Sequence, residues 1–173
     1  IPGRKLNKSI GIMKAYSSCV GDGPFTTELA MTEEEKHLLR EAGHEYGAAT
    51  GRPRRVGWLD TVAVRYGCMM QGATGIALTN IDVLSYLDKI PVCTAYETED
   101  GTITKDFPVT PVLEKCKPVW EYLPGWKCDI SKAHSFDELP ENARKYVEFI
   151  EKETGCPVVI VSNGPARENT IVR

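Results

Sequence analysis

The sequence predicts an α/β protein with a mixed, largely parallel central sheet, flanking helices and a small antiparallel hairpin, in one unit over residues 1–173. Two helical patterns, at 60–70 and 141–153, each lead into a short apolar run, at 76–79 and 158–161. Helices that alternate with buried strands are typical of layered α/β folds. A chain of 173 residues that is 42% hydrophobic also falls within the single-domain range.

The N-terminal part predicts a strand, a loop and a short helix. Residues 10–18 mix β-forming residues with period-two character, and residues 20–25 are dense in turn residues. Thr32 fits a helix N-cap, and Glu35 completes a capping box. We therefore expect a helix that ends near Ala42.

Apolar spacing also predicts which helical side chains are buried. Leu38 and Leu39 are expected to face inward from the first helix. In the second helix, Met69 and Met70 recur at three- and four-residue spacing with other apolar residues and are expected to fill the core. His44 follows the end of the first helix and is interpreted as a surface or capping residue without a chemical role.

The second half of the chain predicts a cap, a hairpin and a central strand. Asp60 is positioned to cap the second helix. Residues 90–96 and 102–104 flank the turn sequence 99–101, which is typical of an antiparallel hairpin. The run 158–161 has the strongest buried-strand pattern and is expected in the middle of the sheet.

Composition excludes several function classes. The formal net charge of −3 gives no basic face for general nucleic-acid binding. The sequence contains neither an apolar run of 18 residues nor a leader pattern, so we expect no membrane span and a cytoplasmic protein. Its six cysteines form no C-x-x-C pair and favour a reducing compartment over a zinc site. The start at Ile1 suggests a fragment.

The segment 47–60 is the richest in groups that bind anions. It contains Arg52, Arg54 and Arg55 among glycines that allow the main chain to approach a ligand closely. Pro53 biases the residue before it towards an extended conformation, so Arg52 and Arg54 should point one way and Arg55 the other. Chemistry alone also allows a solvated loop whose arginines pair with acidic side chains.

A second candidate site lies where the two predicted strands end. Residues 80–82 follow the strand 76–79, and residues 162–164 follow the last buried run, so the two segments should be neighbours. The carboxylate of Asp82 could accept hydrogen bonds from the N1–H and N2–H₂ groups of guanine. Alternatively, Asp82 caps the next segment, 83–87.

Several motifs together resemble one family. They are Lys-Ala-Tyr followed by Val-Gly-x-Gly-Pro-Phe, the loop Gly-x-x-Thr-Gly-Arg-x-Arg-Arg-x-Gly-Trp-Leu-Asp, Leu-Thr-x-x-Asp, Leu-Pro-Gly-Trp and Ser-x-Gly-Pro-x-Arg. From Gly11 onward the chain resembles the C-terminal part of adenylosuccinate synthetase, a longer purine-pathway enzyme. That ligase joins IMP to aspartate at the expense of GTP. Cys19, Thr26 and Asn80 depart from the family, which usually has arginine, proline and lysine there.

The resemblance implies two sets of binding residues. The set for aspartate and IMP comprises Ala48, Ala49, Thr50, Gly51, Arg52, Pro53 and Arg54. The set for GTP comprises Arg54, Asn80, Ile81, Asp82, Ser162, Asn163 and Gly164. Arg52 would bridge towards IMP and aspartate, Arg54 would reach the GTP phosphates, and Arg55 would have a structural role.

The resemblance also implies what this fragment lacks. The family's glycine-rich phosphate loop, its general-base aspartate and its catalytic histidine belong to the N-terminal part of the longer enzyme. We therefore expect neither catalytic residues nor metal ligands here, and no turnover by the fragment. The intact enzyme would use GTP as a co-substrate, require Mg²⁺ and form a homodimer.

Two other functions remain open. A non-catalytic guanine-nucleotide-binding module would use the same recognition residues without turnover. A switch like the small G proteins is suggested only by Asn80 and Asp82, and the absence of a G-x-x-x-x-G-K-[ST] loop argues against it.

Overall fold

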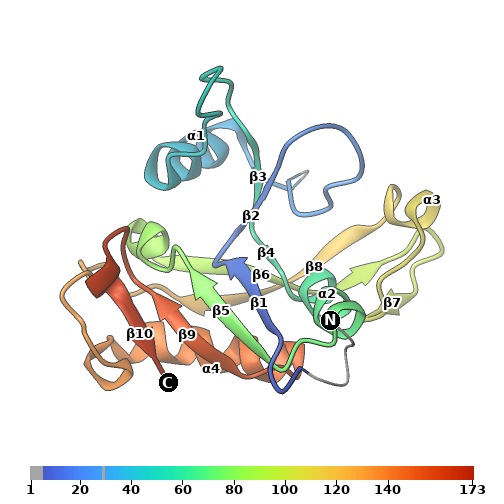
Figure 1. The fold of residues 1–173 in the computed structure, drawn as a ribbon. Helices are drawn as coiled ribbons and strands as arrows, with labels where there is room; N and C mark the ends of the chain where they lie inside the picture. Colours follow the sequence, from blue (N-terminus) through green and yellow to red (C-terminus); the bar gives the residue numbers. More distant parts are fainter. Residues whose placement is uncertain (1–5, 29) are drawn as a thin grey trace.

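The structure is a computed structural model that describes residues 6–28 and 30–173 (Figure 1). Its main sheet has four strands in the order β1-β5-β9-β10. These are β1 (Ile10–Lys14), β5 (Gly75–Thr79), β9 (Val158–Ser162) and β10 (Thr170–Val172). The first three strands are parallel, and β10 is antiparallel to β9. The predicted central place of the last apolar run is thus confirmed.

A second sheet is built around the long strand β6 (Lys89–Glu97). Strand β4 (Leu59–Asp60) pairs with β6 in parallel, and β7 (Ile103–Thr104) and β8 (Lys117–Pro124) pair with it in antiparallel fashion. The predicted hairpin corresponds to β6 and β7. The mixed, largely parallel α/β class is confirmed, although the β-structure is divided between separate sheets rather than gathered in one.

The predicted strand at residues 10–18 is also divided. After β1, the buried residues Ala15 and Tyr16 turn the chain, and β2 (Ser17–Cys19) pairs with β3 (Arg55–Gly57) in a two-stranded antiparallel ribbon. The hydroxyl group of Tyr146 donates a hydrogen bond of 2.6 Å to the carbonyl oxygen of Ala15 and stabilises this turn. The ribbon connects the main sheet to the arginine-rich segment.

Helices cover the sheets and carry the expected caps. The helical segments are α1 (Glu33–Gly43), α2 (Thr61–Gln71), α3 (Thr110–Leu113) and α4 (Glu141–Thr154), with 3₁₀ turns η2 (Asp82–Tyr86), η3 (Phe136–Glu138) and η4 (Arg167–Asn169). Thr32 and Glu35 form the predicted capping box, and Asp60 Oδ1 accepts a hydrogen bond of 3.0 Å from Ala63 N. Helix α4 packs on β9 and β8, and α2 packs on α4 and β6.

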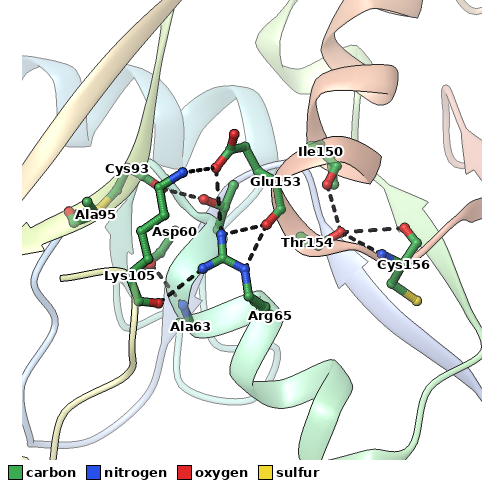
Figure 2. Close-up of polar contacts among 11 residues, drawn as sticks. Asp60, Ala63, Arg65, Cys93, Ala95, Lys105, Ile150, Glu153, Thr154 and Cys156 are labelled. Atoms are coloured by element: carbon green, nitrogen blue, oxygen red, sulfur yellow. Dashed lines mark hydrogen bonds and ion pairs between the residues drawn. The ribbon is translucent and has the colours of Figure 1, made fainter.

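Arg65, in α2, contacts the end of α4 and the segment that follows β7 (Figure 2). Its Nε and Nη2 atoms donate to the carbonyl oxygen of Glu153 at the end of α4, at 2.8 and 2.5 Å, and its Nη1 atom donates to Lys105 O at 3.0 Å. The carboxylate of Glu153 also pairs with Lys105 Nζ at 3.0 Å. This cluster fixes α2 against α4 and the segment after β7, away from the strand ends where ligands are expected.

Two predictions of buried helical side chains were wrong. Leu39 is fully buried, but Leu38 is 46% exposed. Met69 and Met70, which were expected in the core, are 68% and 64% exposed, because α2 buries its first turn, including Val62, and leaves its C-terminal turn uncovered. Periodicity locates an apolar stripe but does not show whether another element of the chain covers it.

Candidate functional site

The carboxyl ends of β5 and β9 meet at one edge of the main sheet. Ile81 N donates a hydrogen bond of 3.4 Å to Ser162 O, so the two predicted loops are neighbours as expected. A cavity of about 420 Å³ opens beside them. Its lining consists of residues from the two loops and from the end of α1: Ala42, Gly43, His44, Thr79, Asn80, Asp82, Val83, Ser162, Gly164 and Pro165.

Asp82 is half-buried at the wall of this cavity. Burial raises the pKa of its carboxyl group, hydrogen bonds from the backbone N–H groups of Asp82 and Val83 lower it, and the charge of Asp129 raises it further. The net direction is upward. Asp82 is the first residue of η2, after the N-cap Ile81, and among the described residues η2 has no side-chain cap hydrogen bond. The cap that the sequence allowed at Asp82 is therefore not formed, and Asp82 instead lines the cavity.

The remaining residues of the two loops divide between cavity and core. Asn80 has a φ of 61°, a left-handed conformation that asparagine tolerates well. Ser162 Oγ donates to Gly164 O at 3.0 Å, and both residues line the cavity. Asn163, in contrast, is fully buried, and its Nδ2 atom donates to Ile130 O and Ala133 O. The Asn163 side chain thus anchors the loop and does not face the cavity.

The arginine loop projects beyond the strand ends, between α1 and β3 (Figure 1). Its tip is closed by hydrogen bonds from Gly51 N to Gly47 O, at 2.8 Å, and from Gly47 N to Arg52 O, at 2.9 Å. Gly51 has a φ of 65°, which favours glycine. Residues 48–53 are exposed, so the predicted aspartate- and IMP-binding segment is open to solvent.

The three arginines of the loop differ in their contacts. Arg54 Nη1 pairs with Glu45 Oε2 at 3.0 Å. Arg55 pairs with Glu28, at 2.6 Å from Nη2, and its Nη1 atom donates to two main-chain carbonyl groups. Arg54 and Arg55 therefore face different partners, as the alternation predicts. Arg52 is exposed, and within residues 6–28 and 30–173 its guanidinium group forms no ion pair.

Sequence reasoning missed the carboxylate at the centre of this region. Glu45 is 1% exposed and accepts hydrogen bonds from Lys14 Nζ, Tyr16 Oη and Arg54 Nη1, at 2.6, 2.5 and 3.0 Å. Burial alone would raise the pKa of Glu45, but these three hydrogen bonds and the charge of Lys14 outweigh it and hold the pKa below its usual range. The Lys-Ala-Tyr motif was the only sequence signal for this cluster.

His44 was given no chemical role from the sequence, yet it lines the cavity. It caps the C-terminus of α1 in a left-handed conformation, with a φ of 51°. Among the residues that the structure describes, no helix is long and apolar enough to span a bilayer. The same residues contain no group of three or more histidine, cysteine and acidic side chains arranged to hold a metal ion.

Together, these features define a class: an open α/β protein with polar loops beside a cavity at the carboxyl ends of its parallel strands and an adjacent arginine-rich loop. The sequence model of the adenylosuccinate synthetase family matches residues 1–171. The chain belongs to the adenylosuccinate synthetase family.

Individual relatives agree with this assignment. The adenylosuccinate synthetase of Geobacter sulfurreducens is 52% identical over 170 residues, which cover 98% of this chain and 39% of the relative. That of Geotalea daltonii is 50% identical over the same coverage. A structure of fully ligated adenylosuccinate synthetase from Plasmodium falciparum superposes with a TM-score of 0.93 at 42% identity, over 100% of this chain and 41% of the other. The chain thus spans about two fifths of its relatives' length.

Proposed function

We propose that residues 1–173 form the substrate- and GTP-recognition part of a GTP-dependent ligase. The reaction would convert IMP and L-aspartate into adenylosuccinate, with hydrolysis of GTP to GDP and phosphate. One observation carries the proposal: Asn80, Asp82, Ser162 and Gly164 line a single cavity in a chain of the adenylosuccinate synthetase family. The arginine loop beside this cavity supplies the positive charge that a carboxylate and phosphates require.

Each part of the site has a distinct role in this proposal. Asp82 would accept the N1–H and N2–H₂ groups of guanine, which adenine cannot match. Ser162 and Gly164 would add hydroxyl and main-chain contacts to the same nucleotide. Residues 48–54 would bind aspartate, with Arg52 bridging to IMP and Arg54 reaching the GTP phosphates. Phosphoryl transfer depends mainly on such positioning and charge stabilisation.

The chemical step itself is proposed to require residues outside this chain. Aspartate would attack the activated C6 atom of IMP and displace phosphate. Mg²⁺ would stabilise the phosphate charge during transfer, and its protein ligands are proposed to lie outside this chain. We therefore assign no step of the reaction to a metal held by this chain, and we propose that the 173-residue chain alone binds without turnover. The intact enzyme would be a cytoplasmic homodimer.

The decisive experiment replaces Asp82 by asparagine in the full-length enzyme that contains this segment. Asp82→Asn exchanges one acceptor oxygen for a donor amide, which leaves a guanine N–H group facing another N–H group. The ratio of kcat/KM for GTP to that for XTP should fall, because XTP carries a carbonyl group where guanine has its amino group. Asp137→Asn, a matched change at a 94% exposed side chain outside the cavity lining, should leave the ratio unchanged.

Two outcomes would contradict the proposal. If Asp82→Asn kept the wild-type GTP-to-XTP ratio, Asp82 would not select the guanine base. A thermal melt of this variant should change little, because asparagine caps a helix about as well as aspartate. If the isolated chain released phosphate in the presence of IMP, aspartate, GTP and Mg²⁺, the assignment of a recognition role without turnover would be wrong. If the isolated chain binds GTP but the full-length protein shows no ligase activity, the alternative of a non-catalytic guanine-nucleotide-binding module gains support.

A further inference from the structure

The buried carboxylate of Glu45 lies between the arginine loop and the end of β1. We infer that Glu45 is a positioning residue, which fixes the orientation of Arg54 for its anionic ligand and connects the loop to the nucleotide cavity. This inference rests on the ligand role proposed above for Arg54. It goes beyond that role because Glu45 lines neither the cavity nor the exposed part of the loop.

Glu45 holds Arg54 by two independent contacts. The side-chain contact joins Glu45 Oε2 to Arg54 Nη1 at 3.0 Å. The main-chain contact joins Arg54 N to Glu45 O at 2.9 Å. Arg40 secures the same junction, because its carbonyl oxygen accepts from Glu45 N and its Nε atom donates to Arg54 O at 2.8 Å. Both the backbone and the guanidinium group of Arg54 are thereby fixed relative to the end of α1.

The contact with Glu45 leaves most N–H donors of the Arg54 guanidinium group free. A guanidinium group has five N–H donors, and among the described residues only Nη1 of Arg54 donates to the protein. The Arg54 side chain is 33% exposed, so its remaining donors are accessible to a ligand. Glu45 neutralises only one of its two cationic partners, Lys14 and Arg54, and the cluster keeps a net positive charge. A carboxylate that orients an arginine without neutralising the whole cluster leaves it able to bind an anion.

The neighbouring arginine shows the opposite arrangement. Arg55 donates from Nε to Glu28 and from Nη1 to the carbonyl oxygens of Gly21 and Gly23, and its Nη2 atom pairs with Glu28. All three nitrogens of the Arg55 guanidinium group are thus in contact with other residues of the protein. The pair of Arg55 and Glu28 is a matched control, since it also joins an arginine of this segment to a glutamate, but four of the five N–H donors of Arg55 are engaged by the protein.

Tyr16 extends the cluster towards the nucleotide cavity. Its hydroxyl group donates to Glu45 at 2.5 Å and packs so closely under Gly43 that a Cβ atom added there would lie 2.3 Å from it. Gly43 itself lines the cavity. Burial is the main cause that raises the pKa of Tyr16. The hydrogen bond to Glu45 and the charge of Glu45 come next, and the charge of Asp82 also raises this pKa. The chain of contacts therefore runs from Arg54 through Glu45 and Tyr16 to the cavity wall.

The test is a double-mutant cycle in the full-length enzyme, with Glu45→Gln, Arg54→Leu and the two changes combined. Glu45→Gln preserves the side-chain shape but places a neutral amide beside Arg54. We expect it to raise the KM for aspartate and for GTP by about tenfold, since a charge-assisted hydrogen bond is lost. In the Arg54→Leu background the same change should add less than about twofold, because Glu45 acts through Arg54. Glu28→Gln should leave both KM values within about twofold of wild type.

The outcomes separate this inference from the function on which it rests. If Arg54→Leu leaves the KM values unchanged, the proposed ligand role of the loop fails. The inference is overturned if Arg54→Leu raises the KM values but Glu45→Gln only lowers the melting temperature. It is also overturned if the effects of the two substitutions on KM multiply independently in the double variant. In either case Glu45 is merely structural. Should Glu45→Gln fail to fold, Glu45→Asp replaces it in the cycle. Aspartate keeps the charge at a shorter reach, so KM should rise less than in Arg54→Leu, again without further effect in that background.

Discussion

Arg54 and Arg55 are adjacent in the sequence, but they belong to two ionic networks. The networks differ in the burial of the carboxylate and in how many guanidinium nitrogens contact the protein. The Arg54 network centres on the fully buried carboxylate of Glu45, which also binds Lys14 and Tyr16. The Arg55 network is a partly exposed pair with Glu28, in which every guanidinium nitrogen already has a partner in the protein. The number of arginines in a loop therefore does not show how many of them can bind a ligand. An arginine whose guanidinium nitrogens all contact the protein has a structural role.

The largest expected effect comes from removing the buried carboxylate. Glu45→Ala leaves two cationic groups and a buried hydroxyl group without their shared acceptor. We expect the free energy of unfolding to fall by about 3 kcal/mol, the lower end for a broken buried pair, because Lys14 and Arg54 remain about one third exposed. Glu28→Ala should cost about 1 kcal/mol or less. Equal losses in urea unfolding curves would contradict the distinction between the two networks.

The second prediction concerns ligand use. Arg54→Leu in the full-length enzyme should lower kcat/KM for aspartate and for GTP by about 10- to 150-fold. This corresponds to the loss of roughly 1.5–3 kcal/mol of binding free energy. Arg52→Leu should chiefly impair the use of aspartate and IMP. Arg55→Leu should lower the melting temperature and leave kcat/KM nearly unchanged. If Arg55→Leu lowered kcat/KM as much as Arg54→Leu, the number of guanidinium contacts within the protein would not distinguish a structural arginine from a ligand-binding one.

A third prediction examines the close approach of Tyr16 to α1. Gly43→Ala would force the Tyr16 hydroxyl group away from Glu45, at a cost of about 1–3 kcal/mol. The better helix propensity of alanine offsets about 0.5–1 kcal/mol of this, so the net loss should be about 0–2.5 kcal/mol. Gly67→Ala in α2, where the added Cβ atom meets open space, should instead stabilise the protein. Thermal melts of both variants would decide, and stabilisation by Gly43→Ala would show that the packing is loose.

The smallest expected effect is a difference in pH dependence. The folded pKa of Glu45 lies below its unfolded value, so its ionisation contributes stability that is present above the unfolded pKa of about 4.3 and is lost as pH falls through the folded pKa. The groups that face this carboxylate are Lys14, Tyr16 and Arg54. The stability difference between wild type and Glu45→Gln should therefore narrow on acidification. A difference that is constant between pH 7 and pH 3 would exclude this linkage.

Much of the fold could be predicted because its signals are local. The capping box of Thr32 and Glu35 spans four residues, and the hairpin turn lies within residues 99–101, so each could be identified without the rest of the chain. The adjacency of residues 80–82 and 162–164 followed from a general rule about parallel strand ends. Met69 and Met70 were misassigned because the same apolar spacing occurs on covered and uncovered helix faces.

The sequence by itself determined the α/β class, the two loops that bear the candidate site and the family to which they are similar, since caps, turns, apolar runs and motifs are short-range patterns. Only the tertiary structure decided which arginine keeps free donors, that Asn163 faces the core, and that Glu45 joins Lys14 and Tyr16. These contacts link residues 31 and 29 positions apart. Such pairings depend on how separate elements pack, and no periodicity or spacing within either segment encodes them.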